Sequence, residues 1–106
     1  MSFHFIVRFE ALAGKDAAFR DALLSVIGPS RAEDGCLAMQ VFEPVHEPGI
    51  FAIHSEWVDE AAFERHSAMP HTLRFLNSAR ELLTEPVHGM RLREIEEQSG
   101  ASIANS

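Results

Sequence analysis

A chain of 106 residues is long enough for one domain and leaves little room for a second. Nine Lys and Arg against 16 Asp and Glu give a formal net charge of −7, which argues against nucleic acids and anionic membranes as partners, because both require a basic face. No apolar run approaches the roughly 18–20 residues of a membrane span.

The N-terminal stretch and the cysteine content favour the cytoplasm. Arg8 and Glu10 interrupt the apolar start of the chain, and no cleavage site of small residues follows, so we expect no signal peptide. A single cysteine, Cys36, cannot form an internal disulfide. We therefore expect a cytoplasmic protein in which Cys36 is a small buried side chain at the start of a strand and not a nucleophile.

The first two elements follow from hydrophobic periodicity. Residues 3–10 alternate with period two and predict a strand. Residues 15–27 carry an apolar stripe at helical spacing, and we expect Gly28 and Pro29 to interrupt that helix, with a short helical turn before Gly35. One side of the strand carries Phe3, Phe5, Val7 and Phe9, and the other carries His4, Ile6, Arg8 and Glu10.

The middle of the chain predicts a hairpin. Residues 36–44 and 50–58 read as two strands, joined by a loop over residues 45–49 that has Pro44 before it and Pro48 within it. In the second of these strands the alternation separates two faces. One face carries Phe51, Ile53, Ser55 and Trp57, and the other carries His54 and Glu56.

Two helices and a last strand complete the pattern. Asp59 is a good N-cap for a helix through about residue 67, and Pro70 suits the first turn of another that runs to about residue 83. Residues 87–96 predict a fourth strand. We expect one domain over residues 1–97 and a flexible C-terminal tail over residues 98–106, because the last stretch is small, polar and aperiodic.

The resulting βαββαβ order, with its second helix split in two, predicts an α+β ferredoxin-like fold. Right-handed crossovers give a four-stranded antiparallel sheet with the helices on one face. The other face then lacks a cover, although Ile6 makes it partly apolar. A second copy of the same sheet is the simplest cover, so we expect a homodimer.

Three segments, taken with the element order, resemble the antibiotic biosynthesis monooxygenase (ABM) family of dimeric α/β barrel proteins. They are RAEDGCL at residues 31–37, SEWVD at residues 55–59 and ERHSAMPH at residues 64–71. The resemblance implies oxygenation of phenols, quinols or anthrones without metal or flavin. Other members isomerise or degrade small signalling sugars. A haem-degrading branch relies on an Asn and a His whose matching positions here are Val7 and Leu76, which argues against haem.

His66 and His71 are the candidate catalytic residues. Imidazole exchanges protons near neutral pH, and oxygenation without a cofactor needs a base, because a phenolate gives an electron to O₂ more readily than a phenol does. A spacing of five residues across Pro70 is not the i,i+4 spacing of a helical metal pair, so we expect no metal. The alternative is structural: His71 would satisfy the start of a helix, and His66 would pack at a helix end.

The candidate substrate-binding residues are mostly aromatic and apolar. They would line a flat pocket for a planar ring, with Ser55 as a hydrogen-bonding group. Trp57 has an alternative role as core anchor, and the whole apolar face has one as the sheet-to-sheet core of a dimer. The set comprises Trp57, Ser55, Phe5, Val7, Phe9 and Phe75.

The remaining polar residues suggest no cofactor. No metal-ligand spacing unites the other histidines, and the chain has no Gly-rich phosphate loop, no CxxC pair and no dinucleotide fingerprint. We expect Arg8, Arg91 and Arg93 to pair with acidic residues, unless one of them captures an anionic substrate.

These observations predict an enzyme: an oxidoreductase that uses O₂ to oxygenate a small aromatic or quinone-like substrate without any cofactor. Two other hypotheses stay open. One is an isomerase or degrading enzyme for a small sugar or aldehyde, which an inward-facing Arg8 or Arg91 would favour. The other is a non-enzymatic dimeric binding or stress-response module, in which the two histidines would face solvent or lack a cavity.

Overall fold

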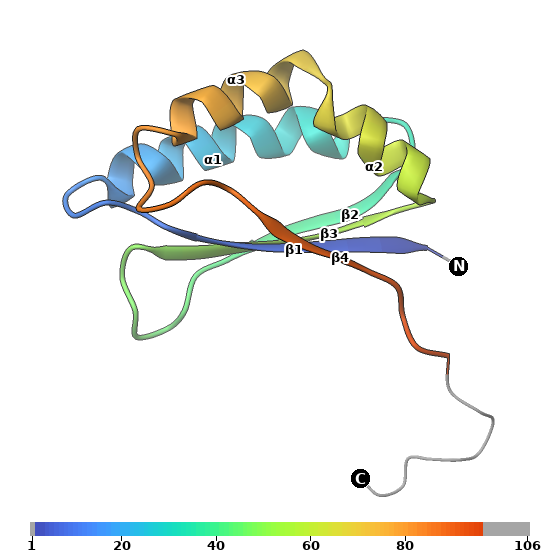
Figure 1. Cartoon of the computed structure of the whole chain (residues 1–106), viewed down its shortest axis with the longest axis horizontal. Helices are drawn as coiled ribbons and strands as arrows, with labels where there is room; N and C mark the ends of the chain where they lie inside the picture. Colours follow the sequence, from blue (N-terminus) through green and yellow to red (C-terminus); the bar gives the residue numbers. More distant parts are fainter. Residues whose placement is uncertain (1, 97–106) are drawn as a thin grey trace, which may run out of the picture.

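Four strands and three helices form two layers (Figure 1). The computed structural model describes residues 2–96. Its antiparallel sheet has the strand order β2-β3-β1-β4, and all three helices cover the same face, which confirms the ferredoxin-like fold. The strands are β1 (Phe3–Glu10), β2 (Cys36–Phe42), β3 (Ile50–Trp57) and β4 (Gly89–Leu92), and the helices are α1 (Asp16–Arg31), α2 (Glu60–Ser67) and α3 (Pro70–Ala79).

The two central strands, β1 and β3, set the faces of the sheet. They pair along their whole length, from Phe3 opposite Trp57 to Glu10 opposite Ile50. Every second residue of β3 is buried, as the alternation predicted. The buried face of β1 and β3 packs beneath the helices, so it belongs to the core of one chain and not to a sheet-to-sheet dimer core.

Large aromatic side chains fill this core. The Phe19 ring lies 5.2 Å from the ring of Phe51 and 5.0 Å from that of Phe9, and thereby joins α1 to both central strands. Phe75 of α3 packs edge-on against Phe9 at 6.0 Å. Burial of such side chains contributes about 1.5–3 kcal/mol each to folding.

Helix α1 does not stop at Gly28 and Pro29, contrary to the sequence-based expectation; it continues to Arg31. Pro29 lacks the N–H that would bond one turn back, which weakens the helix locally. Two contacts of the last turn offset this loss. Ser30 is buried against the core, and the Arg31 guanidinium donates two hydrogen bonds to the Met39 carbonyl of β2, at 3.1 and 2.8 Å.

The C-terminal elements are shorter than predicted. Helix α3 ends at Ala79, because the next residues turn back to the end of β1: the Leu12 N–H donates to the Leu82 carbonyl, and the Thr84 N–H donates to the Glu10 carbonyl. Strand β4 keeps four residues of the expected ten. The tail expected at residues 98–106 lies outside the described residues.

The sheet face opposite the helices is uncovered (Figure 1). On the two central strands the imidazoles of His4 and His54 stack on this face, with Nδ1 of His4 2.9 Å from Nε2 of His54. Large apolar side chains are exposed around this pair, and the strand register places Ile6, Phe42 and Met90 on this face.

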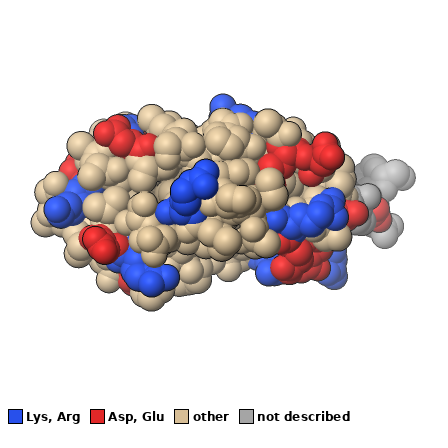
Figure 2. Space-filling view, turned by 90° about the horizontal axis from the view of Figure 1, so that it is seen from above, with Lys and Arg blue, Asp and Glu red and all other residues tan. Residues whose placement is uncertain are grey.

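The helix-covered side presents charges of both signs, with a basic group near the centre of the face and acidic groups towards both ends (Figure 2). The excess of acidic residues therefore does not form one acidic field on this side. Among the described residues, no helix is long and apolar enough to cross a lipid bilayer.

Gly35 allows β2 to start close to α2. Its φ of +87° is in the left-handed region, and a Cβ there would lie 2.7 Å from the Cβ of Ala62. Gly14 has a similar φ of +79° but open space around it.

We expect Gly35→Ala to lower the free energy of unfolding by at least about 1 kcal/mol more than Gly14→Ala does. Both substitutions carry the left-handed penalty of about 1–2 kcal/mol, and only Gly35→Ala adds a clash. Urea unfolding of both variants measures the difference. Equal losses would show that the contact between Gly35 and α2 is not tight.

Candidate active site

One carboxylate oxygen joins two imidazoles. Oε2 of Glu33 accepts hydrogen bonds from Nδ1 of His66 at 2.9 Å and from Nε2 of His71 at 2.5 Å. The Glu33 side chain is 8% exposed, and the two imidazoles are 14% and 15% exposed. A carboxylate this buried requires hydrogen-bond donors, and both donors here come from histidine.

Glu33 is held in place by its own backbone. It follows the end of α1, where its N–H donates to the Ser30 carbonyl at 3.1 Å. Its carbonyl accepts from the N–H of Cys36, the first residue of β2, at 3.1 Å. The carboxylate therefore belongs to a short connection that is fixed at both ends.

The two histidines flank the turn between α2 and α3. The Asp59 side chain caps α2 by accepting from the Ala62 N–H at 2.9 Å, as predicted. The Met69 N–H donates to the His66 carbonyl at 3.1 Å and closes the turn, and Pro70 then begins α3. A spacing of five residues thus brings both imidazoles to the same carboxylate.

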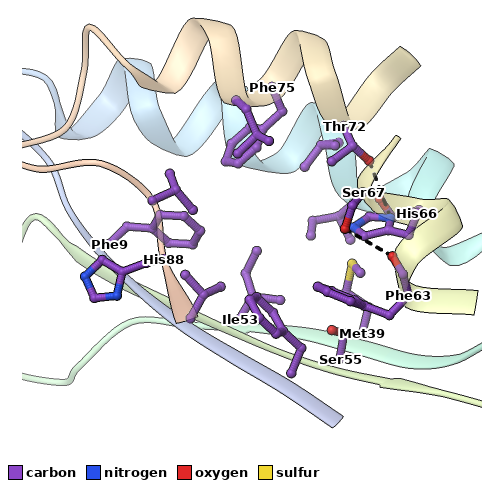
Figure 3. A pocket seen from close by; sticks show the side chains of 17 residues that line it. Phe9, Met39, Ile53, Ser55, Phe63, His66, Ser67, Thr72, Phe75 and His88 are labelled. Atoms are coloured by element: carbon purple, nitrogen blue, oxygen red, sulfur yellow. Dashed lines mark hydrogen bonds between the residues drawn. The ribbon is translucent and has the colours of Figure 1, made fainter. Parts of the chain in front are cut away.

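A cavity of about 200 Å³ lies between the helices and the sheet (Figure 3). His66, Ser67 and Thr72 group on one side of it, and His88 lies across from them. The rest of the wall is mostly apolar. It includes Phe5, Val7, Phe9, Met39, Ile53, Phe63, Phe75 and Leu76.

Most of the predicted site residues meet at this cavity. Its wall includes His66, and the other members of the predicted set found there are Phe5, Val7, Phe9, Ser55 and Phe75. His71 does not line the cavity; it reaches Glu33 from outside the wall. Trp57 is fully buried behind His66, with their ring centroids 4.7 Å apart, and so it packs against the imidazole without forming part of the wall.

Glu33 is the functional candidate that the sequence reasoning missed. It stands in the segment RAEDGCL, but nothing in the spacing shows that its carboxylate meets side chains 33 and 38 residues further along. Ser30 was missed too, because the helix was expected to end before it. Its hydroxyl lines the cavity and has no hydrogen-bond partner among residues 2–96.

The arginines do not enter the cavity. Arg91 donates to the carboxylates of Glu60 and Glu64 on α2, as expected for structural pairing. Arg8 is exposed and, by the alternation of β1, lies on the uncovered side of the sheet. Val7 and Leu76, the positions matched to haem-binding residues, both line the cavity and offer no ligand atom.

The geometry around His66 suits proton transfer. Because Nδ1 donates to the Glu33 carboxylate, the neutral ring carries its lone pair on Nε2. The carboxylate fixes this tautomer and stabilises the imidazolium that forms once Nε2 has taken a proton. His66 is thus an imidazole of fixed orientation at the edge of an apolar cavity.

Comparison with known proteins agrees with this reading of the fold. The family model described as antibiotic biosynthesis monooxygenase matches residues 2–78. The chain belongs to the antibiotic biosynthesis monooxygenase family. This confirms the resemblance that the three sequence segments indicated.

Two curated relatives of the ABM family protein are named as candidate monooxygenases. Rv0793 of Mycobacterium tuberculosis is 32% identical over 94 residues, which cover 89% of this chain and 92% of that protein. YcnE of Bacillus subtilis is 34% identical over 77 residues, which cover 73% of this chain and 81% of YcnE.

Solved structures share the fold. The structure of Rv0793 has a TM-score of 0.85 at 30% identity, and the match covers 93% of this ABM chain and 100% of the Rv0793 chain. The structure of PA3566 from Pseudomonas aeruginosa has a TM-score of 0.83 at 32% identity, and the match covers 90% of this chain and 95% of the PA3566 chain.

Cys36 offers a probe of the Glu33 charge. Burial raises the pKa of the Cys36 thiol, and the negative charge of Glu33 raises that pKa further. A raised thiol pKa leaves less thiolate at neutral pH, so the thiol of this ABM protein is a poor nucleophile.

We expect the alkylation rate of Cys36 by iodoacetamide to reach half its maximum at a pH above the ordinary thiol pKa. Glu33→Gln should move that midpoint to lower pH, because it removes the negative charge. Asp34→Asn, the neighbouring carboxylate, is the control. An unchanged midpoint in Glu33→Gln would show that its carboxylate does not act on the thiol.

Proposed function

We propose that this ABM protein is a cofactor-independent monooxygenase that oxygenates a quinol or another phenolic aromatic with O₂. The observation that carries the proposal is an apolar cavity with one oriented imidazole, His66, in its wall. An apolar cavity suits a planar ring and excludes water from a reactive anion.

The cavity volume limits the substrate. An engineered apolar cavity of about 150 Å³ holds benzene. A cavity of about 200 Å³ therefore matches one substituted ring within a single chain. The unpartnered Ser30 hydroxyl and the nearby Ser55 hydroxyl supply hydrogen bonds for the oxygens of such a ring.

The proposed reaction begins with loss of a phenolic proton. Nε2 of His66 takes the proton, and the Glu33 carboxylate stabilises the resulting imidazolium through Nδ1. The quinolate gives an electron to O₂, and the two radicals combine into a ring-bound hydroperoxide. Loss of water leaves the hydroxyquinone, so quinol and O₂ give hydroxyquinone and H₂O, with every electron coming from the substrate.

The alternative of a sugar or aldehyde isomerase receives less support. An inward-facing Arg8 or Arg91 would have favoured it, and both side chains lie outside the cavity. The non-enzymatic module required histidines in solvent or away from a cavity. His66 is 14% exposed and lines one, which favours an enzyme.

We expect the wild-type protein to consume O₂ with at least one member of a quinol panel, and His66→Ala to lower kcat by about 100- to 10,000-fold, the range for loss of a general base. His71→Ala should have a smaller effect, because His71 acts through Glu33. An oxygen electrode measures these rates, and His46→Ala, in the exposed hairpin loop, is the control. Wild-type uptake that is absent, or equal in His66→Ala, would contradict the proposal.

We also propose that two copies assemble through the uncovered sheet face, as the resemblance to dimeric α/β barrels implies. The exposed apolar side chains of Ile6, Phe42 and Met90 support this assembly, because their burial would stabilise a dimer.

Size-exclusion chromatography with light scattering should give twice the mass of one chain, and Ile6→Asp should shift the protein to the monomer. Leu24→Asp, which places the same charge on an exposed apolar position of α1, should leave the dimer intact. A wild-type monomer at micromolar concentration would refute the assembly.

A further inference from the structure

We propose that Glu33, His66 and His71 form a binding site for a divalent transition-metal ion of the zinc class. One possible ligand atom from each residue lies within 4.8 Å of those from the other two. Nδ1 of His66 and Nε2 of His71 both contact Oε2 of Glu33, at 2.9 and 2.5 Å. An ion bound at about 2.0–2.2 Å from each ligand atom holds those atoms about 3–3.5 Å apart. The triad is therefore close to the ligand spacing of a metal site already.

The donor set selects the class of metal. Two imidazole nitrogens and one carboxylate oxygen are typical ligands of Zn²⁺, Co²⁺ and Fe²⁺, whereas Mg²⁺ and Ca²⁺ prefer sites built from oxygen alone. Three protein ligands leave a fourth position of a tetrahedral ion for water or a small ligand. The Thr72 hydroxyl lies 3.4 Å from Nδ1 of His66 and so is a polar neighbour of the ligand cluster.

The site is also preorganised. Each ligand comes from a segment that backbone hydrogen bonds fix: the connection after α1, the end of α2 and the start of α3. All three side chains are 15% exposed or less, so few side-chain rotamers remain to be lost when an ion binds. Cys36, the single cysteine of the sequence, is not part of the ligand cluster.

Metal binding would reverse the hydrogen-bonding character of His66. A neutral imidazole that ligates through Nδ1 must carry its proton on Nε2. Nε2 then becomes a donor and can no longer take a proton from a substrate. This consequence rests on the proposed function: the ion would switch off the base, and Zn²⁺ would inhibit O₂ uptake.

A second pair of imidazoles provides a control within the same chain. His4 and His54 lie 2.9 Å apart on the uncovered sheet face, and the metal-ligand cluster found among residues 2–96 does not include them. If two neighbouring imidazoles were enough to bind the ion, this pair would bind it as well as the triad.

The test is a titration of the full chain with Co²⁺, followed by the visible absorption of four-coordinate cobalt, with Zn²⁺ competition by calorimetry. We expect one Co²⁺ per chain. His71→Gln places an amide N–H where Nε2 donates to Glu33, and His66→Asn does the same for Nδ1, so both variants keep the hydrogen bonds of the fold. Each should weaken Co²⁺ binding by at least about ten-fold. His54→Asn is the matched control and should bind as the wild type does.

Three results would overturn the proposal: no cobalt spectrum in the wild type, equal binding in His71→Gln, or loss of binding in His54→Asn. Circular dichroism and thermal unfolding check that each variant folds. The experiment measures bound metal, and this measurement does not depend on O₂ uptake. Cobalt binding without quinol oxygenation would support the metal site and contradict the proposed function, and the reverse result would do the opposite.

Discussion

The buried carboxylate of Glu33 is the interaction on which the arrangement of the site depends. A carboxylate that is 8% exposed is costly unless donors surround it, and its donors are imidazoles from two different helices. The same hydrogen bonds therefore tie the end of α1 to the turn between α2 and α3. They also fix which nitrogen of His66 remains free, so one contact sets both the position of the helices and the chemistry of the ring.

A small domain leaves little volume for a cavity, since each unfilled space forfeits packing energy. Here the cavity lies between the helices and the central strands, and residues of α1, α2 and α3 all contribute to its wall on the helix side. The aromatic cluster around Phe19 supplies a dense core beside it. Phe9 and Phe75 belong both to this cluster and to the cavity wall, so the dense core directly supports one side of the open space.

The periodicity of the sequence predicted all the elements and the faces of β1 and β3, because side chains alternate wherever one face is buried. It misplaced the end of α1, since Gly28 and Pro29 are poor helix residues and the contacts that hold Ser30 and Arg31 are tertiary. The end of α3 was misplaced because the backbone pairs with β1 instead of continuing the helix.

Tertiary contacts, which local sequence patterns do not show, also limited the prediction of the site. His66 and five apolar or hydroxyl-bearing wall residues could be predicted from residue type and face. Glu33 could not, because its partners are far away in the sequence and only the folded chain brings them together. Burial also distinguishes Trp57, which packs behind His66, from the side chains that form the wall.

The triad of Glu33, His66 and His71 lies at the margin of the cavity. The groups that orient His66 are therefore different from the side chains that shape the cavity. The groups that orient His66 come from the α1–β2 connection and from α3, whereas the shape of the cavity depends on side chains such as Val7, Ile53 and Phe75. Exchanges among apolar residues on that wall alter which molecules fit and leave the carboxylate and its imidazoles in place. A single apolar substitution on that wall can therefore change which molecules fit this chain without altering the groups that orient His66.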